Sequence, residues 1–229
     1  YTKMLLNEFY GIEECKLTLI YNGLIDQAIF LDEVERMQRK RDLFFGEGEK
    51  LILFVGRLDD IKGVDYLIEA FAKVIKKSSN TRLLIVGDGN YSRYLQMSAD
   101  IWSRITFIGK ISKQKLYEFY QIADVGVMPS FHEQCSYAAI EMMMHGLPLI
   151  ITNTTGLSEM IHHQNVECRL ILKEDQNELR LSVEELSKCL LKIVTDDCWA
   201  REVGKLNRCR YKDAFSLEKM RMAFESFYS

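Results

Sequence analysis

Short runs of wholly apolar residues alternate with segments of helical spacing along most of this chain. Strands are expected at 51–55, 82–86, 105–108, 125–128, 149–151 and 170–172, and helices at 65–77, 91–100, 112–123 and 136–145. Strands that are apolar throughout belong in a parallel sheet whose two faces are both covered by helices. The alternation therefore predicts one doubly wound α/β domain.

Two outer regions flank this predicted domain. Lys16–Tyr21 has the composition of a strand and ends at the turn signal Asn22-Gly23. Three closing helices are expected at 184–195, 199–210 and 217–227. The chain starts at Tyr1 without an initiator Met or a signal-peptide pattern, and we expect a fragment of a longer protein.

Composition narrows the classes of function. Hydrophobic residues make up 48% of the 229 residues and charged residues 28%, so intrinsic disorder is excluded. The net charge of -3 argues against a nucleic-acid partner. No run of 18 apolar residues occurs, and we expect no membrane span. The six cysteines form no Cys-x-x-Cys pair and are expected to be buried free thiols in a reducing compartment.

The loop after the first strand carries two cations, Arg57 and Lys62, behind the turn residue Gly56. In a doubly wound sheet, ligands bind beyond the carboxyl ends of the strands, where this loop would lie. Two cations there suit a phosphate-bearing ligand. Taken alone, the loop is better explained by ordinary solvated surface charges.

The loop after the fourth strand is the most informative. Glu133 lies in this loop, and Glu141 lies eight positions later on a helix that begins near Ser136. A helix N-terminus can bind an anion, and carboxylates can accept hydrogen bonds from hydroxyl groups. These parts suit a ligand with an anionic middle and polyhydroxyl ends, such as a nucleotide sugar.

Other chemistries lack their motifs. His132-Glu133 does not open a zinc-binding His-Glu-x-x-His helix, because position 136 is Ser. The segment Gly87-Asp88-Gly89 has Ser92 where a dinucleotide fingerprint needs its third glycine, so it predicts a tight turn. Neither a Gly-x-Ser-x-Gly elbow nor an Asp-x-Asp motif occurs. We therefore expect neither a metal ion nor a cofactor.

With these motifs in order, the chain resembles the retaining GT-B glycosyltransferases of family 4 over residues 22–161. The motifs are Asn22-Gly23, Gly56-Arg57-Leu58 with Lys62-Gly63, Val86-Gly87-Asp88-Gly89, Phe107-Ile108-Gly109, Pro129-Ser130 with Glu133 and Glu141, and Gly146-Leu147-Pro148. The resemblance implies a Rossmann-like sheet that forms the C-terminal, donor-binding half of a GT-B fold.

The resemblance also implies roles for single residues. Arg57 and Lys62 would neutralise the donor diphosphate and the charge on the leaving group, and Glu133 would contact the donor sugar; these three are the expected catalytic residues. Glu141 would accept hydrogen bonds from the ribose. The remaining expected donor-binding residues are Gly56, Gly87, Lys110 and Ile111 of the base-reading loop, and the backbone of Ser136 and Tyr137 at the phosphate. The implied transfer needs no metal.

The same resemblance divides the chain. Residues 1–15 would be the remnant of an interdomain connection, 16–210 the donor-binding domain, and 211–229 a helix that crosses back to a missing N-terminal acceptor domain. The implied protein is cytoplasmic, either free or peripheral to the inner face of a membrane, and the isolated fragment could dimerise.

Three alternatives to this reading differ in kind. One is a nucleotide-sugar epimerase of the same architecture, and another is a phosphorylase. The third is a non-catalytic module that only binds a nucleotide sugar. The joint presence of Arg57, Lys62, Glu133 and Glu141 argues against the non-catalytic module.

Overall fold

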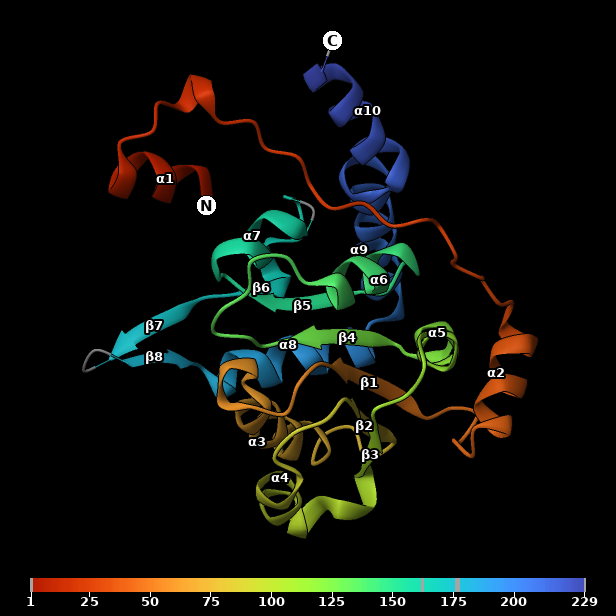
Figure 1. Cartoon of the computed structure of the whole chain (residues 1–229). Helices are drawn as coiled ribbons and strands as arrows, with labels where there is room; N and C mark the ends of the chain where they lie inside the picture. Colours follow the sequence, from red (N-terminus) through yellow and green to blue (C-terminus); the bar gives the residue numbers. More distant parts are fainter. Residues whose placement is uncertain (1, 162, 176–177, 229) are drawn as a thin grey trace.

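The computed structural model describes residues 2–161, 163–175 and 178–228 and contains a parallel sheet of six strands (Figure 1). The strands are β1 (Lys50–Val55), β2 (Thr81–Val86), β3 (Ile105–Gly109), β4 (Val125–Met128), β5 (Leu149–Thr152) and β6 (Arg169–Leu170). Their order is β3-β2-β1-β4-β5-β6. The predicted doubly wound fold is confirmed, and the strand order reverses between β1 and β4, where such sheets bind ligands.

Helices lie on both sides of this sheet (Figure 1). They are α1 (Thr2–Tyr10), α2 (Glu33–Asp42), α3 (Val64–Val74), α4 (Tyr91–Met97), α5 (Lys113–Ile122), α6 (Tyr137–Met144), α7 (Thr155–Met160), α8 (Val183–Thr195), α9 (Asp197–Arg210) and α10 (Leu217–Tyr228). On one side α3 packs against α8; elsewhere α5 packs against α2, and α6 against α9. No described helix is both long enough and apolar enough to cross a membrane.

The core follows directly from the apolar runs. Leu51, Ile52, Leu53 and Phe54 of β1 are fully buried, as a central parallel strand requires. The run 142–144 of three methionines in α6 is also fully buried and fills the core beside β4 and β5.

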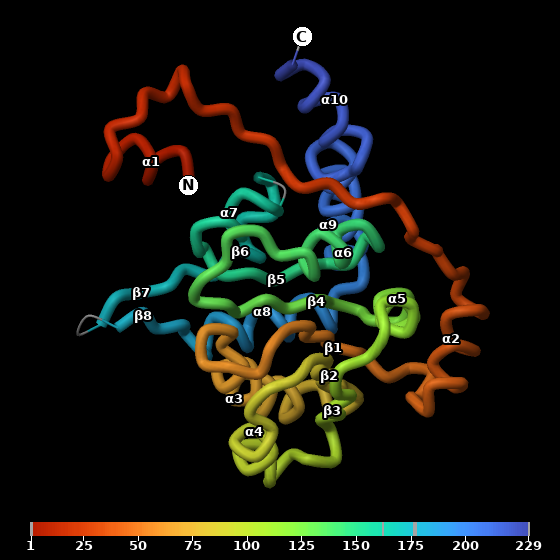
Figure 2. The backbone as a smooth tube through the Cα atoms, viewed as in Figure 1, coloured from red at the N-terminus to blue at the C-terminus, as the bar shows by residue number. Residues whose placement is uncertain are grey.

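The predicted strand at Lys16–Tyr21 is wrong. This stretch begins in a short 3₁₀ turn (Glu14–Lys16) and continues as extended chain outside the sheet. Figure 2 shows it running from α1, which stands apart from the sheet, past α10 toward α2. Side chains and the C-terminal region hold the segment instead: the rings of Tyr21 and Phe215 lie 5.0 Å apart, and Leu24 N–H donates to the Phe215 carbonyl at 2.9 Å.

Several elements were not predicted, among them helices α1 and α2, helix α7 and a two-stranded hairpin. The predicted strand 170–172 is divided: β6 ends at Leu170, and Leu172 opens an antiparallel hairpin of β7 (Leu172–Asp175) and β8 (Glu178–Leu181). The six-residue helix α7 follows β5.

The expectation that the cysteines are buried is also largely wrong. Cys168 and Cys189 are buried, whereas Cys15, Cys198 and Cys209 are exposed and Cys135 is half-buried; all six are free thiols.

Candidate functional site

A pocket of about 620 Å³ opens at the carboxyl ends of β1, β2 and β3. Its lining residues are Val55, Gly56, Arg57, Val86, Gly87, Asp88, Gly89, Lys110, Ile111 and Leu116. Five of the predicted donor-binding residues are among them, drawn from three separate loops. The structure thus gathers around one cavity residues that the chain separates by more than fifty positions.

Two of the glycines that line this pocket, Gly56 and Gly87, approach each other through their backbone. Gly87 has φ 144°, and a Cβ there would lie 1.7 Å from the Gly56 carbonyl oxygen, so only glycine fits. The loops are joined by main-chain bonds: Gly56 N–H donates to Val86 at 3.0 Å and Gly87 N–H to Gly109 at 3.0 Å. The segment Gly87-Asp88-Gly89, predicted as a tight turn, bends at Gly87 and then pairs with the loop after β1: Leu58 N–H donates to the Asp88 carbonyl at 2.8 Å, and Asn90 N–H donates to the Leu58 carbonyl at 3.0 Å.

A second pair of loops meets beside the pocket. Gly63 has φ 64°, and a Cβ on it would lie 2.2 Å from the Pro129 carbonyl oxygen. Phe131 N–H donates to the Ile61 carbonyl at 2.7 Å, and the rings of Phe131 and Tyr66 lie 5.3 Å apart. The loop after β1 is therefore clamped onto the loop after β4.

This clamp brings two predicted catalytic residues into contact. Lys62 Nζ donates to Glu133 Oε1, and Ser130 Oγ lies 3.4 Å from the same oxygen. Their side chains are 14% and 13% exposed. The two charges thus neutralise each other in a partly desolvated setting, where a pair is stronger than at the surface.

The backbone of Glu133 is held from the other side by α7. Its carbonyl accepts hydrogen bonds from Gly156 N–H at 2.8 Å and from Thr155 Oγ1. The helix that the sequence pattern missed therefore fixes the position of a predicted site residue.

Arg57, the third predicted catalytic residue, is more exposed to solvent than Lys62 and Glu133. Its side chain is 77% exposed, and one guanidinium nitrogen lies 3.4 Å from Asp59 Oδ2. A guanidinium carries five N–H donors, so this contact leaves capacity for an anion at the pocket. An exposed pair of this kind contributes little to stability.

Helix α6 begins where the sequence indicates. Ser136 is its N-cap, and its Oγ accepts a hydrogen bond from Ala139 N–H at 3.3 Å. Ser136 is buried, whereas the side chain of Tyr137 is exposed. The first N–H groups of α6 lie directly after the loop that carries Glu133.

Glu141 lies one turn further into α6 and is only 8% exposed. Its Oε2 accepts a hydrogen bond from the Tyr120 hydroxyl at 3.1 Å, and its Oε1 lies 3.3 Å from Lys113 Nζ. Burial raises the pKa of Tyr120 well above its usual value, and the charge of Glu141 raises it further. Tyr120 therefore stays a phenol and a hydrogen-bond donor.

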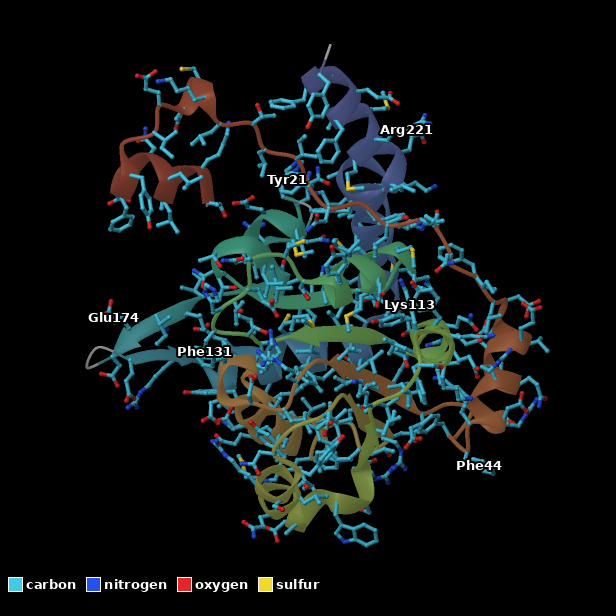
Figure 3. All side chains as sticks on the ribbon, viewed as in Figure 1. Tyr21, Phe44, Lys113, Phe131, Glu174 and Arg221 are labelled. Atoms are coloured by element: carbon cyan, nitrogen blue, oxygen red, sulfur yellow. The ribbon has the colours of Figure 1, made fainter. Side chains whose placement is uncertain are left out.

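Lys113 is a site residue that sequence reasoning missed. Its pKa is raised, first by its interaction with the Tyr117 hydroxyl and then by Glu141, so it stays charged. No local pattern marks it, because its partner lies 28 positions away on another helix. In Figure 3 the labelled Lys113 lies beside α5 and the labelled Phe131 beside α3.

Arg57 and Lys110 line the pocket, while Lys62 and Lys113 pair with the predicted site residues Glu133 and Glu141. Within residues 2–161, 163–175 and 178–228, no three His, Cys, Asp or Glu side chains gather as a metal ion would require. The arrangement offers donors for an anion at the pocket and carboxylates for hydroxyl groups next to it.

Comparison with known proteins identifies the family to which this chain belongs. Residues 49–189, more than half of the chain, match the family model described as glycosyl transferases group 1. An uncharacterized glycosyltransferase of Methanocaldococcus jannaschii, MJ1607, is 34% identical over 160 residues, which are 68% of this chain and 41% of that protein. The chain thus spans less than half the length of this relative.

Solved structures agree on the fold. Sucrose-phosphate synthase from Thermosynechococcus elongatus superimposes with a TM-score of 0.81 at 24% identity, covering 99% of this chain and 55% of that one. The Anabaena protein HepE in complex with UDP gives a TM-score of 0.83 at 15% identity, covering 99% and 61%. HepE has also been solved in complex with UDP-glucose. With the family model matched across the sheet and its rim loops, the chain belongs to the group 1 glycosyltransferases and has the Rossmann-like fold of their GT-B architecture.

Proposed function

We propose that this chain binds a nucleoside diphosphate sugar and serves as the donor-binding half of a retaining glycosyltransferase. The observation that carries the proposal is the convergence of Gly56, Arg57, Gly87, Lys110 and Ile111 on one pocket beside the Lys62–Glu133 pair. A likeness in fold to HepE, a protein solved with UDP and with UDP-glucose, supports the same ligand class.

In this proposal the pocket at β1 to β3 takes the base, and the diphosphate lies toward Arg57 and Lys62. As the bond to the sugar breaks, negative charge grows on the departing diphosphate. Cations held in place stabilise that charge without reorganising at the moment of reaction. The first N–H groups of α6, from Ser136 and Tyr137, add donors aimed at the same phosphates.

In this proposal the carboxylates of Glu133 and Glu141 bind the hydroxyl groups at the two ends of the nucleotide sugar. Glu133 lies beside the phosphate cations and receives the sugar, while Glu141 receives the ribose. For Glu133 this means that the donor must share or displace Lys62, its present partner. Donor binding therefore converts an internal ion pair into two contacts with ligand.

Transfer also needs an acceptor hydroxyl held against the anomeric carbon. Orientation of that kind supplies much of the rate, and closing the site excludes water as a competing acceptor. We assign the acceptor to a second, N-terminal domain. Accordingly, this chain by itself is expected to bind donor and to hydrolyse it slowly at most, without transferring sugar.

Isothermal titration of the chain with UDP, GDP and ADP, and with the matching nucleosides, tests the proposal. One diphosphate is expected to bind and its nucleoside to bind at least about tenfold more weakly, because the phosphate contacts are charge-assisted. EDTA is expected to leave the affinity unchanged. Equal binding of nucleoside and diphosphate, or no binding of any of the three, would contradict a donor site here.

A further inference from the structure

We propose that Lys113 is a ribose-binding residue and that, together with Glu141, it selects nucleotides with an intact 2′,3′-diol. The inference rests on the proposed function and adds to it a specificity-determining residue that the family motifs do not contain. It starts from an ion pair that joins the first residue of α5 to the middle of α6.

The ammonium of Lys113 caps the solvent side of a buried carboxylate. Lys113 Nζ lies 3.3 Å from Glu141 Oε1 and 5.4 Å from the centre of the Tyr117 ring. The Lys113 side chain is 54% exposed, whereas that of Glu141 is 10% exposed. Tyr120 holds the inner oxygen of Glu141. A ligand that approaches Glu141 from solvent therefore meets Lys113 at the same point.

Lys113 and Glu141 together can satisfy the hydrogen bonds of a diol more completely than Glu141 can alone. A hydroxyl group both donates and accepts a hydrogen bond, whereas a carboxylate only accepts and an ammonium only donates. Each carboxylate oxygen has two lone pairs, so Glu141 can accept from a hydroxyl while it keeps Lys113 or Tyr120. Ribose hydroxyls that donate to Glu141 would in turn accept from Lys113.

The position of Lys113 along the chain supports this assignment. Ile111 and Leu116 both line the base pocket, and Lys113 lies between them in sequence. A base in that pocket would place its ribose beside this first turn of α5. The ribose would then lie between the pocket and Glu141, within the space that Lys113 borders.

A different result is expected if the role of Lys113 is purely structural. If Lys113 only neutralises Glu141, its loss can lower thermal stability, but it also frees acceptor capacity on Glu141, so the preference for ribose over deoxyribose ligands would stay the same or rise. If it contacts the diol, its loss changes the ratio of affinities for ribose and deoxyribose ligands. The ratio is therefore the decisive quantity.

The test compares Lys113→Met with Lys115→Met, a control on the same helix whose ammonium pairs with Glu118 at 2.9 Å. UDP, GDP and ADP are titrated first, and then the 2′-deoxy and 3′-deoxy forms of whichever binds. Wild type and the control are expected to prefer the ribonucleotide by about tenfold or more over each deoxy form. In Lys113→Met we expect this preference to shrink by at least about threefold, mainly through weaker ribonucleotide binding.

Two results would overturn the inference. An unchanged or larger preference in a folded Lys113→Met protein would show that Lys113 does not contact the diol, and would leave the proposed function standing. If wild type binds none of the three diphosphates, the donor site itself is absent, and this inference fails with it. Thermal unfolding of both variants establishes that each is folded.

Discussion

The two ends of strand β4 carry charged clusters of opposite character. At its amino end, Asp124 is surrounded: Oδ1 lies 3.1 Å from Arg36 and 3.6 Å from Lys50, while Oδ2 lies 3.4 Å from Lys40 and accepts from Leu51 N–H at 2.8 Å. Beyond its carboxyl end, the Glu133 carboxylate contacts Lys62 and the hydroxyl of Ser130 among the residues that the structure describes.

This difference separates a structural cluster from a site. Burial alone would raise the pKa of Asp124, but Arg36 and Lys40 outweigh it and lower the pKa overall. Its acceptor capacity is filled by the protein itself, and Lys40 is buried with it. The Lys62–Glu133 pair keeps unused donors and acceptors beside an open pocket. The two ends of β4 therefore differ in whether their hydrogen-bond donors and acceptors are already filled by the protein, rather than in whether they are charged.

The strongest test of this contrast is Asp124→Asn. Removing one partner of a buried ion cluster leaves Lys40 without its counter-charge, and we expect the free energy of unfolding to fall by about 3–5 kcal/mol. Because the folded pKa of Asp124 is lowered, its contribution is fully present above the unfolded value and is lost as pH falls through the folded one. Urea unfolding at pH 7 and below pH ~4 should show the gap between wild type and variant narrowing in acid.

Asp42→Asn is the matched control for this measurement, since Asp42 is exposed on α2 and accepts only from Gln38 among the hydrogen bonds described. A loss in Asp124→Asn no larger than in Asp42→Asn would mean that the amino-end cluster is not structural.

At the other end of β4, Lys62→Ala should act on ligand binding. We expect nucleoside diphosphate affinity to fall by about tenfold or more, since a charge-assisted contact is worth roughly 1.5–3 kcal/mol. The loss should exceed that in Arg57→Ala, because the half-buried Glu133 would then face the phosphates without a counter-charge. Calorimetry on Lys73→Ala, whose ammonium pairs with the remote Glu184, provides the control.

The smallest effect on the nucleotide itself is expected from Glu133→Gln. This change frees Lys62, so diphosphate affinity should stay the same or rise by up to about threefold. The additional affinity for the matching nucleotide sugar should disappear. Titrating Glu133→Gln and Glu184→Gln with both ligands decides the matter. A loss for the plain diphosphate as large as for the nucleotide sugar would refute the division of roles between Glu133 and Glu141.

Much of the rim was predictable because it depends on local chemistry. Fully apolar runs mark strands β1 and β2 within one residue, and Gly56, Gly87 and Gly109 stand where chains leave a parallel sheet. Parallel strands share one edge, so the meeting of these loops follows from topology alone. The contact between Lys62 and Glu133 could be anticipated as proximity, but not as an ion pair.

The remaining features depend on pairings between distant segments. Residues 16–21 have the composition of a strand, but they lie outside the sheet, and the ring of Tyr21 packs against Phe215 instead. The β7–β8 hairpin is rich in charge: β7 has a single apolar residue, and the apolar alternation in β8 spans only four residues. Lys113 meets Glu141 only because side chains of α5 reach α6 in the folded protein, which no local pattern encodes.

The close approach of Gly87 to Gly56 has a consequence for redesigning this protein. Any side chain at position 87 would collide with main chain, so variation cannot act on that part of the pocket. The opposite wall, with Lys110, Ile111 and Leu116, consists of side chains that can be exchanged. Directed evolution toward a different nucleotide should therefore accumulate its substitutions between residues 110 and 116. A library of variants confined to that stretch covers the side chains that can change the nucleotide preference.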